Sequence, residues 1–341
     1  MFIRNRWYVA AWDKEVSRKP LARTICGEPV VLFRKGDGTA VALGDYCPHR
    51  LLPLSMGQVE GDAIRCGYHG MLVDGAGRCV EMPGQEEPPR KLQVKAYPIV
   101  ERYRFVWVWI GDEAAADPAL LPDFWFCEDK AWTFDGDAYR VACDYRLLVD
   151  NLMDLTHETY VHPSSIGQKE IVEAPIETRV EGEAVIVERW MRDIDAPPFW
   201  RTFLRKPGLV DRWQICRFAL PAAVTIEVGV ALAGTGAPEG DRSQGVEGVV
   251  VNFMTPETET SCWYYWGMAR GFDVGDAGLT ERMRQSQAAV FAEDVEVLEA
   301  QQKSIAAHPD KRLVVLGIDA GGAHARRLIE RAAVESGRAA A

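Results

Sequence analysis

Long apolar runs are missing from this sequence of 341 residues. No stretch reaches the roughly 18 consecutive apolar residues that a membrane-spanning helix needs. The start of the chain, interrupted by Arg4 and Arg6, also lacks the apolar core and the cleavage site of a signal peptide. These absences predict a chain with no membrane partner and a cytoplasmic location.

The sequence also has fewer basic than acidic residues. Lysine and arginine together number 39 against 50 aspartate and glutamate residues, which gives a net charge of −11. We therefore expect no nucleic-acid partner, because phosphate binding needs clustered lysine and arginine. The acidic surface is compatible with docking to a basic patch on another protein.

Cysteine pairs of the C-x-x-C type are absent, although the chain has eight cysteines. Cysteines scattered in this way are typical of a reduced cytosolic protein rather than a small disulfide-rich scaffold. Two of them, Cys47 and Cys66, differ from the rest because each has a histidine nearby.

These two cysteines and their histidines form a metal-binding pattern. Cys47-Pro48-His49 is followed, after sixteen residues, by Cys66-Gly67-Tyr68-His69. Two thiolates and two imidazoles are the ligand set of a Rieske [2Fe–2S] cluster, in which the histidines raise the reduction potential. A structural zinc site has the same ligand types and is the alternative. It is disfavoured because zinc fingers usually place cysteine with cysteine, whereas each segment here mixes the two types.

Residues 1–111 predict short strands separated by turns. Two apolar runs, residues 30–33 and 40–43, flank a hairpin signal, and residues 105–110 form a strongly β-prone run. The stretch that follows is rich in alanine, aspartate and proline, so we place a domain boundary after residue 111.

Residues 112–341 predict a mixture of helices and strands. We expect helices at residues 145–162, 279–305 and 321–334, strands at residues 224–232, 248–253 and 261–268, and a mobile loop at residues 234–248.

The predicted helix at residues 145–162 is apolar almost all round, which indicates a buried helix. It carries His157 and His162, whose separation is about 140° around an ideal helix. The helix must therefore end or distort between them for both to reach one ion. Pro163 supports an end there.

Three further polar residues, Asp150, Asn151 and Asp154, lie beside these histidines in the sequence. Burying so many polar groups is costly unless a site compensates for it. Two histidines and one carboxylate form the facial triad of non-haem Fe(II) oxygenases, which leaves positions open for O2 and substrate. The pattern therefore predicts a mononuclear iron site.

The carboxylate of this site is expected on the helix at residues 279–305. Its apolar stripe consists of Leu279, Met283, Val290, Val297, Leu298 and Ile305. Asp294 falls at the centre of the stripe, whereas Glu293 lies at its edge. A carboxylate that faces a core needs a metal or an arginine partner. We favour the metal, and an Asp–Arg pair is the alternative.

At these motifs the chain resembles the Rieske non-haem iron aromatic-ring oxygenases, and within them the O-demethylating monooxygenases of the vanillate branch. The resemblance covers nearly the whole chain, and the two ligand motifs are specific to the superfamily. The further segments that carry it are residues 144–162, 164–169, 196–200, 211–216 and 266–270.

The resemblance implies an α+β fold in which an N-terminal Rieske [2Fe–2S] β-domain, residues 1–111, precedes a helix-grip (START-like) catalytic domain, residues 112–341. It also implies two ligand sets. The cluster ligands would be Cys47, His49, Cys66 and His69, and the ligands of the mononuclear Fe(II) would be His157, His162 and Asp294.

The resemblance further implies a head-to-tail homotrimer, in which the cluster of one subunit lies near the iron of the next. By motif position, Asp154 would connect His69 of one subunit to His157 of the next. Asn151 would lie near the iron, one helical turn earlier. Asp154 and Asn151 are thus the expected catalytic residues beside the ligands.

The implied activity is O-demethylation of vanillate, or of a close methoxybenzoate, to protocatechuate and formaldehyde. Electrons from NADH or NADPH would pass through a separate flavin and iron–sulfur reductase to the cluster, and on through His69 and Asp154 to the Fe(II). O2 and a small aromatic substrate are the other expected partners.

The residues that contact the substrate are less clearly indicated by the sequence. Arg217 is a candidate for binding a carboxylate, although a single arginine is more often an exposed ion-pair partner. The aromatic run at residues 263–266 either lines the pocket or packs in the core, and packing is the commoner role.

Other functions stay open on these residues alone. A Rieske oxygenase that hydroxylates a ring or demethylates another substrate would share both metal sites. A non-catalytic Rieske electron carrier would hold the cluster but no mononuclear iron, and a zinc-stabilised structural protein would be colourless.

Overall fold

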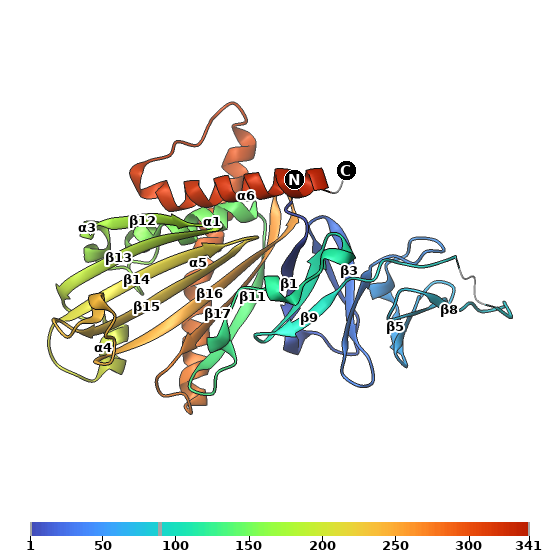
Figure 1. Cartoon of the computed structure of the whole chain (residues 1–341), viewed down its shortest axis with the longest axis horizontal. Helices are drawn as coiled ribbons and strands as arrows, with labels where there is room; N and C mark the ends of the chain where they lie inside the picture. Colours follow the sequence, from blue (N-terminus) through green and yellow to red (C-terminus); the bar gives the residue numbers. More distant parts are fainter. Residues whose placement is uncertain (1, 88–90, 340–341) are drawn as a thin grey trace. The chain divides into compact units, whose positions relative to one another are not determined.

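The chain, seen as a computed structural model, divides into two compact units (Figure 1). The first contains the residues up to Asp123, together with Thr255–Thr258 and the end of the last helix. The second contains Phe124–Met254 and Glu259–Ala332. The boundary predicted after residue 111 lies inside the first unit, before this division.

The structure describes residues 2–87 and 91–339. The predicted domains 1–111 and 112–341 also include residue 1, residues 88–90 and residues 340–341, which lie outside the described residues.

Three small antiparallel sheets make up the first unit, with strand orders β1-β10-β9, β2-β3-β4 and β5-β6-β7-β8. The predicted hairpin is β3 and β4, and the predicted strand at residues 105–110 is β10, so both predictions are confirmed. The strands are β1 (Arg6–Trp12), β2 (Leu21–Ile25), β3 (Glu28–Arg34), β4 (Ala40–Gly44), β5 (Gln58–Glu60), β6 (Ala63–Arg65), β7 (Leu72–Asp74), β8 (Cys79–Glu81), β9 (Ile99–Arg102) and β10 (Phe105–Ile110).

Strand β3 lies between two apolar clusters. Its side chains alternate across the strand, so Val30 and Leu32 enter one cluster while Val31 and Phe33 enter the other. The second cluster also contains Cys47 and Cys66. The two cysteines among the predicted cluster ligands are therefore anchored in a packed core.

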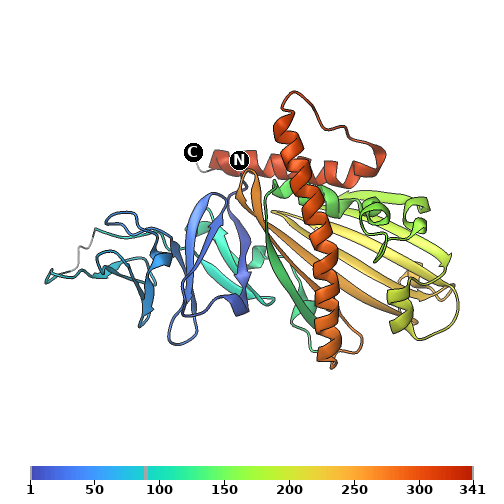
Figure 2. The same ribbon diagram turned by 180° about the vertical axis from the view of Figure 1, so that it is seen from behind.

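A seven-stranded sheet dominates the second unit, in the order β11-β17-β16-β15-β14-β13-β12. Figure 2 shows the long helix α5 lying across one face of this sheet, which agrees with the predicted α+β class. The strands are β11 (Thr133–Val141), β12 (Ile176–Glu181), β13 (Ala184–Ile194), β14 (Val210–Ala219), β15 (Ala223–Leu232), β16 (Gly245–Thr258) and β17 (Ser261–Arg270), and the helices are α1 (Tyr145–Met153), α2 (Glu158–Val161), α3 (Lys169–Glu173), α4 (Pro198–Leu204), α5 (Ala277–Ala307) and α6 (Ala320–Ala339).

Helix α5 is held to the sheet by aromatic packing. It begins after Asp276, whose carboxylate accepts a hydrogen bond from the Leu279 backbone N–H. Phe291 packs against Tyr264 and Trp266 of β17, with ring centroids 5.5 and 5.1 Å apart. The helix predicted at residues 279–305 is confirmed, and Asp294 is buried on its packed face. The placement of Val297 on that face is wrong, because Val297 is exposed.

The helix predicted at residues 145–162 is wrong as a single element. Helix α1 ends at Met153, and the backbone of Asp154 is extended, with φ −134° and ψ 99°. The Asp154 carboxylate accepts a hydrogen bond from the Thr156 backbone N–H and so starts a new turn, which leads into α2. The chain therefore breaks before His157, and α2 then ends at Val161, so the end predicted between the two histidines is confirmed.

The loop predicted at residues 234–248 is shorter than expected, because β16 already begins at Gly245. The strands predicted at residues 224–232 and 261–268 correspond to β15 and β17, and the helix predicted at residues 321–334 lies within α6.

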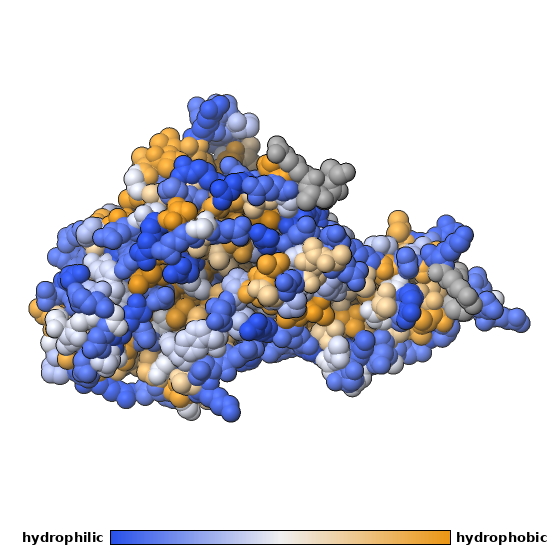
Figure 3. Space-filling view, in the orientation of Figure 1, coloured by the Kyte–Doolittle hydropathy of each residue, from blue (hydrophilic) through white to orange (hydrophobic). Residues whose placement is uncertain are grey.

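An exposed apolar segment connects α5 and α6. Leu313, Val314, Val315 and Leu316 are all exposed, and hydrophobic surface gathers there in Figure 3. Among the described residues, no helix is both long enough and apolar enough to cross a membrane. The cytoplasmic location stays a prediction.

Substitution of Tyr264 tests the packing beneath α5. The Tyr264 hydroxyl donates a buried hydrogen bond of 2.7 Å to Asn252 Oδ1 on β16. Tyr264→Phe leaves that amide oxygen buried without its donor, so we expect the free energy of unfolding to fall by about 1–3 kcal/mol. Urea unfolding measures the change, and Tyr160→Phe, on a side chain exposed to solvent, should shift it by less than about 0.5 kcal/mol. Equal stability of the two variants would contradict this account.

Candidate active site

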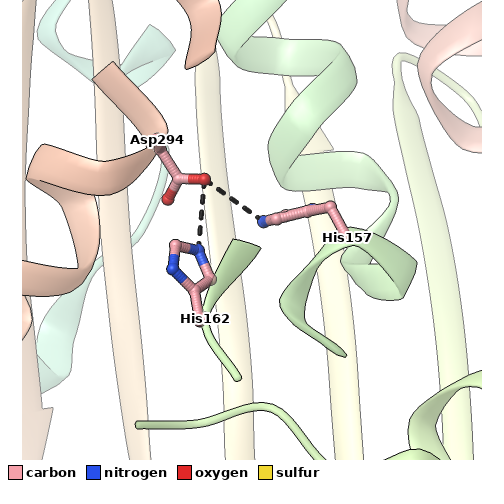
Figure 4. Close-up of side chains that lie close together, drawn as sticks. All are labelled: His157, His162 and Asp294. Carbon is pink, nitrogen blue, oxygen red and sulfur yellow. Dashed lines mark hydrogen bonds and ion pairs between the residues drawn. The ribbon is translucent and has the colours of Figure 1, made fainter. Parts of the chain in front are cut away.

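Two neighbouring histidines and an aspartate from a distant part of the sequence converge in the second unit (Figure 4). Asp294 Oδ1 lies 3.2 Å from His162 Nε2 and 3.4 Å from His157 Nε2. All three potential ligand atoms lie within 4.8 Å of one another. Neighbouring ligands of one ion, each about 2.1 Å from it, stand about 3 Å apart. The triad predicted from the sequence is therefore assembled with a spacing suited to one metal ion.

Both histidines are oriented by a hydrogen bond at their other ring nitrogen. His157 Nδ1 donates to the backbone carbonyl of Asp154 at 2.7 Å. His162 Nδ1 donates to Glu293 Oε2 at 2.5 Å. Such outer contacts fix the ring orientation and leave Nε2 as the ligand atom. The arrangement thus presents two Nε2 atoms to the point that Asp294 faces.

The three groups also tune one another electrostatically. Burial alone raises the pKa of Asp294, but hydrogen bonds to His157 and His162 outweigh it and lower the pKa to about 2. Burial lowers the pKa of both histidines, but hydrogen bonds to Asp294 outweigh it, so each pKa lies above its ordinary value of 6.5. A buried anion is thus compensated by two partners that a divalent cation can replace.

Asn151 and Asp154 lie beside the triad in different ways. Asn151 Nδ2 donates to Asp294 Oδ1 at 3.1 Å, so Asn151 lies beside one of the predicted iron ligands. Asp154 contacts His157 of its own chain through the backbone carbonyl and not through its carboxylate. The carboxylate caps the following turn and lies 4.0 Å from Arg189.

A cavity of about 840 Å³ of empty space, part of it open to solvent, reaches the triad. Its walls are largely apolar and come from the α1–α2 region, α4, the sheet and α5. They include Leu155, Phe199, Val228, Val250, Met268 and Val290.

One wall of the cavity is polar although it is buried. Gln214 Nε2 donates to Glu158 Oε2 at 2.8 Å, and Arg212 Nη2 lies 3.8 Å from the same oxygen. Arg212 Nη1 also donates to Gln168 Oε1 at 2.7 Å. Burial raises the pKa of Glu158, and the charge of Arg212 only partly opposes this. These groups supply the cavity with directional hydrogen bonding.

Arg217, predicted as a carboxylate-binding candidate, does not line this cavity. Its side chain is 45% exposed and lies 3.8 Å from Glu181, so this prediction is wrong. The physical reason is the alternation of β14, on which Arg217 occupies the opposite face from Arg212 and Gln214. No residue of the aromatic run at 263–266 lines the cavity either, and Tyr264, Tyr265 and Trp266 are fully buried in the core.

The predicted cluster ligands of the first unit lie on two loops with matching backbone geometry. In each loop the cysteine carbonyl accepts a hydrogen bond from the fourth residue onward, Leu51 or Gly70, and that residue has a positive φ, 60° or 75°. The cysteine N–H donates to the carbonyl of the fifth residue onward, Leu52 or Met71, at 2.8 Å in both loops. The two loops thus hold their cysteines in the same backbone arrangement.

The side chains of these loops fit a two-iron, two-sulfur cluster. Cys47 and Cys66 are buried, whereas His49 and His69 lie nearer the surface, with ring centroids 4.6 Å apart. His49 Nδ1 is buried without a hydrogen-bond partner, which is unusual for a polar atom and is explained if it binds a metal. Thiols within the core and imidazoles toward solvent match a cluster whose outer iron has histidine ligands.

Sequence reasoning missed the cavity wall and the partner of His162. Glu293 was placed only at the edge of the helix stripe, and its partner is 131 residues away in the chain. Arg212 and Gln214 lie on β14, of which the sequence predicts only residues 213–218 to be strand-like. Their alternation with buried Trp213 was the available signal.

Comparison with known proteins gives two domain matches. Residues 6–98 match the Rieske [2Fe-2S] domain, and residues 141–335 match the vanillate O-demethylase oxygenase C-terminal domain. The vanillate O-demethylase oxygenase subunit of Pseudomonas sp. strain HR199 is 51% identical over 97% of this chain and 95% of its own length.

Two further relatives extend the comparison. The toluene-4-sulfonate monooxygenase iron–sulfur subunit TsaM1 of Comamonas testosteroni is 40% identical over 97% of both chains. A crystal structure of dicamba monooxygenase with non-heme iron and dicamba has a TM-score of 0.86 and 35% identity, and covers 99% of each chain. Together with the domain matches, these similarities confirm the predicted [2Fe–2S] and non-haem iron cofactors.

Removing Glu293 tests the orientation of His162. Glu293→Ala deprives His162 Nδ1 of its acceptor, so we expect Fe(II) to bind about 10- to 100-fold more weakly. Equilibrium titration of Fe(II) under anaerobic conditions measures this. Glu296→Ala, an exposed carboxylate on the same helix, serves as the matched control and should leave the affinity unchanged. An equal effect of both variants would show that helix charge, not His162 orientation, matters.

The raised pKa values of the histidines predict a pH dependence of metal binding. Only neutral imidazoles bind a metal, so protons compete with Fe(II) wherever the pH lies below the folded-state pKa values. Both pKa values lie above 6.5. As the pH is lowered, we therefore expect the affinity for Fe(II) to start falling while the pH is still above 6.5. Each imidazole contributes up to about a tenfold loss per pH unit. Titrations between pH 6 and 8.5 that give one constant affinity would refute this.

Proposed function

Because the chain belongs to the Rieske oxygenases of the vanillate O-demethylase type, we propose that it removes the methyl group of vanillate, or of a close methoxybenzoate. The products are protocatechuate and formaldehyde. The single observation that carries the proposal is the His157, His162 and Asp294 triad at the end of a largely apolar cavity. A non-catalytic electron carrier would leave both the triad and the cavity without a role.

The residues beside each cofactor have separate tasks. Cys47, His49, Cys66 and His69 would hold the [2Fe–2S] cluster, and His157, His162 and Asp294 would hold the Fe(II). When bound, these groups supply electron storage and the oxidation of the substrate methoxy C–H by O2. The hydroxylated methoxy carbon then leaves as formaldehyde, and the aryl oxygen takes up the proton.

The chain's own side chains control access and geometry. Glu293 and the Asp154 carbonyl hold the two imidazoles, and Asn151 holds Asp294. The apolar walls favour an aromatic ring and exclude water from the reacting end. Neither histidine ring can rotate without losing its hydrogen bond. The two Nε2 atoms are therefore held in place, and the positions left open for O2 and substrate stay on the same side of the metal site.

The substrate class follows from the relatives' names as well as from the cavity. One relative is named for vanillate and another for toluene-4-sulfonate. Both names denote an aromatic ring that carries an anionic group. We therefore include in the proposal that the substrate of this chain is an aromatic anion with a methyl group to be oxidised.

Two kinds of protein partner belong to the proposal. An oxygenase component of this type needs a reductase, which would deliver electrons from NADH or NADPH through flavin and iron–sulfur centres. We also propose a homotrimer in which Asp154 links His157 to His69 of a neighbouring copy. The Asp154 side chain is 15% exposed beside His157, and the apolar segment at Leu313–Leu316 is exposed, which supports a covering subunit.

Removal of one iron ligand tests the proposed function. With a reductase, NADH, O2 and vanillate, the wild-type protein should release formaldehyde and protocatechuate in equal amounts. Asp294→Ala should lower turnover by more than about 100-fold, because the Fe(II) loses its carboxylate, while the electron paramagnetic resonance signal of the reduced cluster persists. Formaldehyde release by the variant at the wild-type rate would rule out the proposed iron site.

A further inference from the structure

We propose that Arg212 binds the carboxylate of the substrate and so selects aromatic anions over neutral methoxyarenes, while Gln214 accepts a hydrogen bond from the substrate hydroxyl. This inference rests on the proposed function, because it names the groups that bind the polar substituents of that substrate. Neither residue belongs to the metal ligands or to their hydrogen-bonded partners.

Both residues are aimed into the cavity by the geometry of β14. Arg212 and Gln214 occupy alternate positions, so their side chains leave the strand on the same face, and both line the cavity. Trp213 between them packs into an apolar cluster with Ile186 and Ile215 on the other face. This packing holds the strand and therefore fixes the direction of the two polar side chains.

The charge of Arg212 is unusual in its surroundings. Among the described residues that line the cavity, Arg212 is the one lysine or arginine. Glu158 and Asp294 are acidic, and the two histidines are the proposed iron ligands. A carboxylate that leaves water for a largely apolar cavity needs a cationic partner, since an unpaired buried charge is strongly unfavourable. Arg212 is the side chain placed to provide one.

Arg212 has only part of its hydrogen-bonding capacity engaged by the contacts seen here. Nη1 donates to Gln168, but the distance of 3.8 Å from Nη2 to Glu158 Oε2 is an ion pair beyond hydrogen-bond range. A guanidinium has five N–H donors and binds a carboxylate through two parallel hydrogen bonds. The side chain can therefore receive a ligand carboxylate while Gln168 keeps it in place.

Gln214 adds a second ligand-directed feature. Its Nε2 donates to Glu158, but its Oε1 is buried and has no hydrogen-bond partner. Buried polar atoms are nearly always satisfied, so this acceptor fits a hydroxyl donor supplied by the ligand. A hydroxylated aromatic carboxylate carries both missing partners, a carboxylate for the N–H donors of Arg212 and a hydroxyl for Gln214 Oε1.

A purely structural role for Arg212 is the competing explanation. Its bond to Gln168 ties β14 to the segment between His162 and α3, so a substitution that only loosened this segment would weaken every substrate alike. Recognition of a carboxylate instead changes the preference between a charged and a neutral substrate. The test therefore compares two substrates that differ in that group alone.

The experiment measures kcat/KM and, by calorimetry, Kd for vanillate and for its neutral amide, 4-hydroxy-3-methoxybenzamide. For Arg212→Gln we expect kcat/KM and affinity for vanillate to fall about 10- to 150-fold, the range for a lost charged hydrogen-bond pair. The values for the amide should change by less than about threefold. Arg212→Lys keeps the charge without the planar fork and should lose a smaller part of the preference.

Two control variants separate recognition from structure. Arg217→Gln, an exposed arginine on the same strand, should leave both substrates unchanged. Gln168→Ala removes the structural contact of Arg212 but leaves the guanidinium, so the preference for vanillate should fall by less than it does in Arg212→Gln.

A parallel loss for vanillate and the amide in Arg212→Gln would overturn the inference, as would an unchanged preference. If Arg212→Gln does not fold, an unchanged preference in Arg212→Lys overturns it. If the wild-type protein turns over neither substrate, the proposed function fails, and the calorimetric preference of the wild-type and variant proteins still decides whether Arg212 binds the anion.

Discussion

The structure of the second unit depends on one shared contact, in which Asp294 accepts from both His157 and His162. The carboxylate is buried on a long helix, and the histidines come from the region after a broken helix, more than 130 residues earlier. Burial of this carboxylate would be strongly unfavourable alone. The two imidazoles, or the divalent cation that takes their place as partner, compensate for it and tie helix α5 to the α1–α2 region.

The two units of the chain have separate tasks. The loops that carry Cys47 and Cys66 repeat one backbone geometry and place their thiols in a packed core. The second unit instead builds a cavity, with apolar walls for a ring and a polar wall at Glu158, Arg212 and Gln214. Electron storage and substrate oxidation thus rely on different kinds of packing. The Rieske O-demethylase function follows from the presence of both in one chain.

Most of the predicted ligands could be found from the sequence because they occur in pairs that are close together along the chain. Cys47 with His49, Cys66 with His69, and His157 with His162 each lie within five positions, so spacing alone exposes them. Asp294 was also predictable, because a carboxylate at the centre of an apolar stripe needs a reason to be buried. The α+β class followed from the mixture of β-prone runs and amphipathic helices, and the comparisons with the Rieske oxygenases agree with it.

The remaining features depend on tertiary contacts. The break of the helix at Asp154 results from a side-chain cap that competes with helix continuation, while the surrounding residues are good helix formers. Glu293 meets His162 only after α5 docks on the sheet. The sequence singled out Arg217 and not Arg212, and only the strand register assigns Arg217 to solvent and Arg212 to the cavity.

The central claim is that one chain holds two distinct iron centres. Mössbauer spectroscopy of iron-57-enriched, reduced protein tests it most directly, because it resolves each iron by its ligands and oxidation state. The account predicts a cluster with two inequivalent irons, one with sulfur and one with mixed sulfur and nitrogen ligands, together with a separate high-spin ferrous ion. A spectrum with the cluster alone, or with a lone ferrous ion and no cluster, would contradict it.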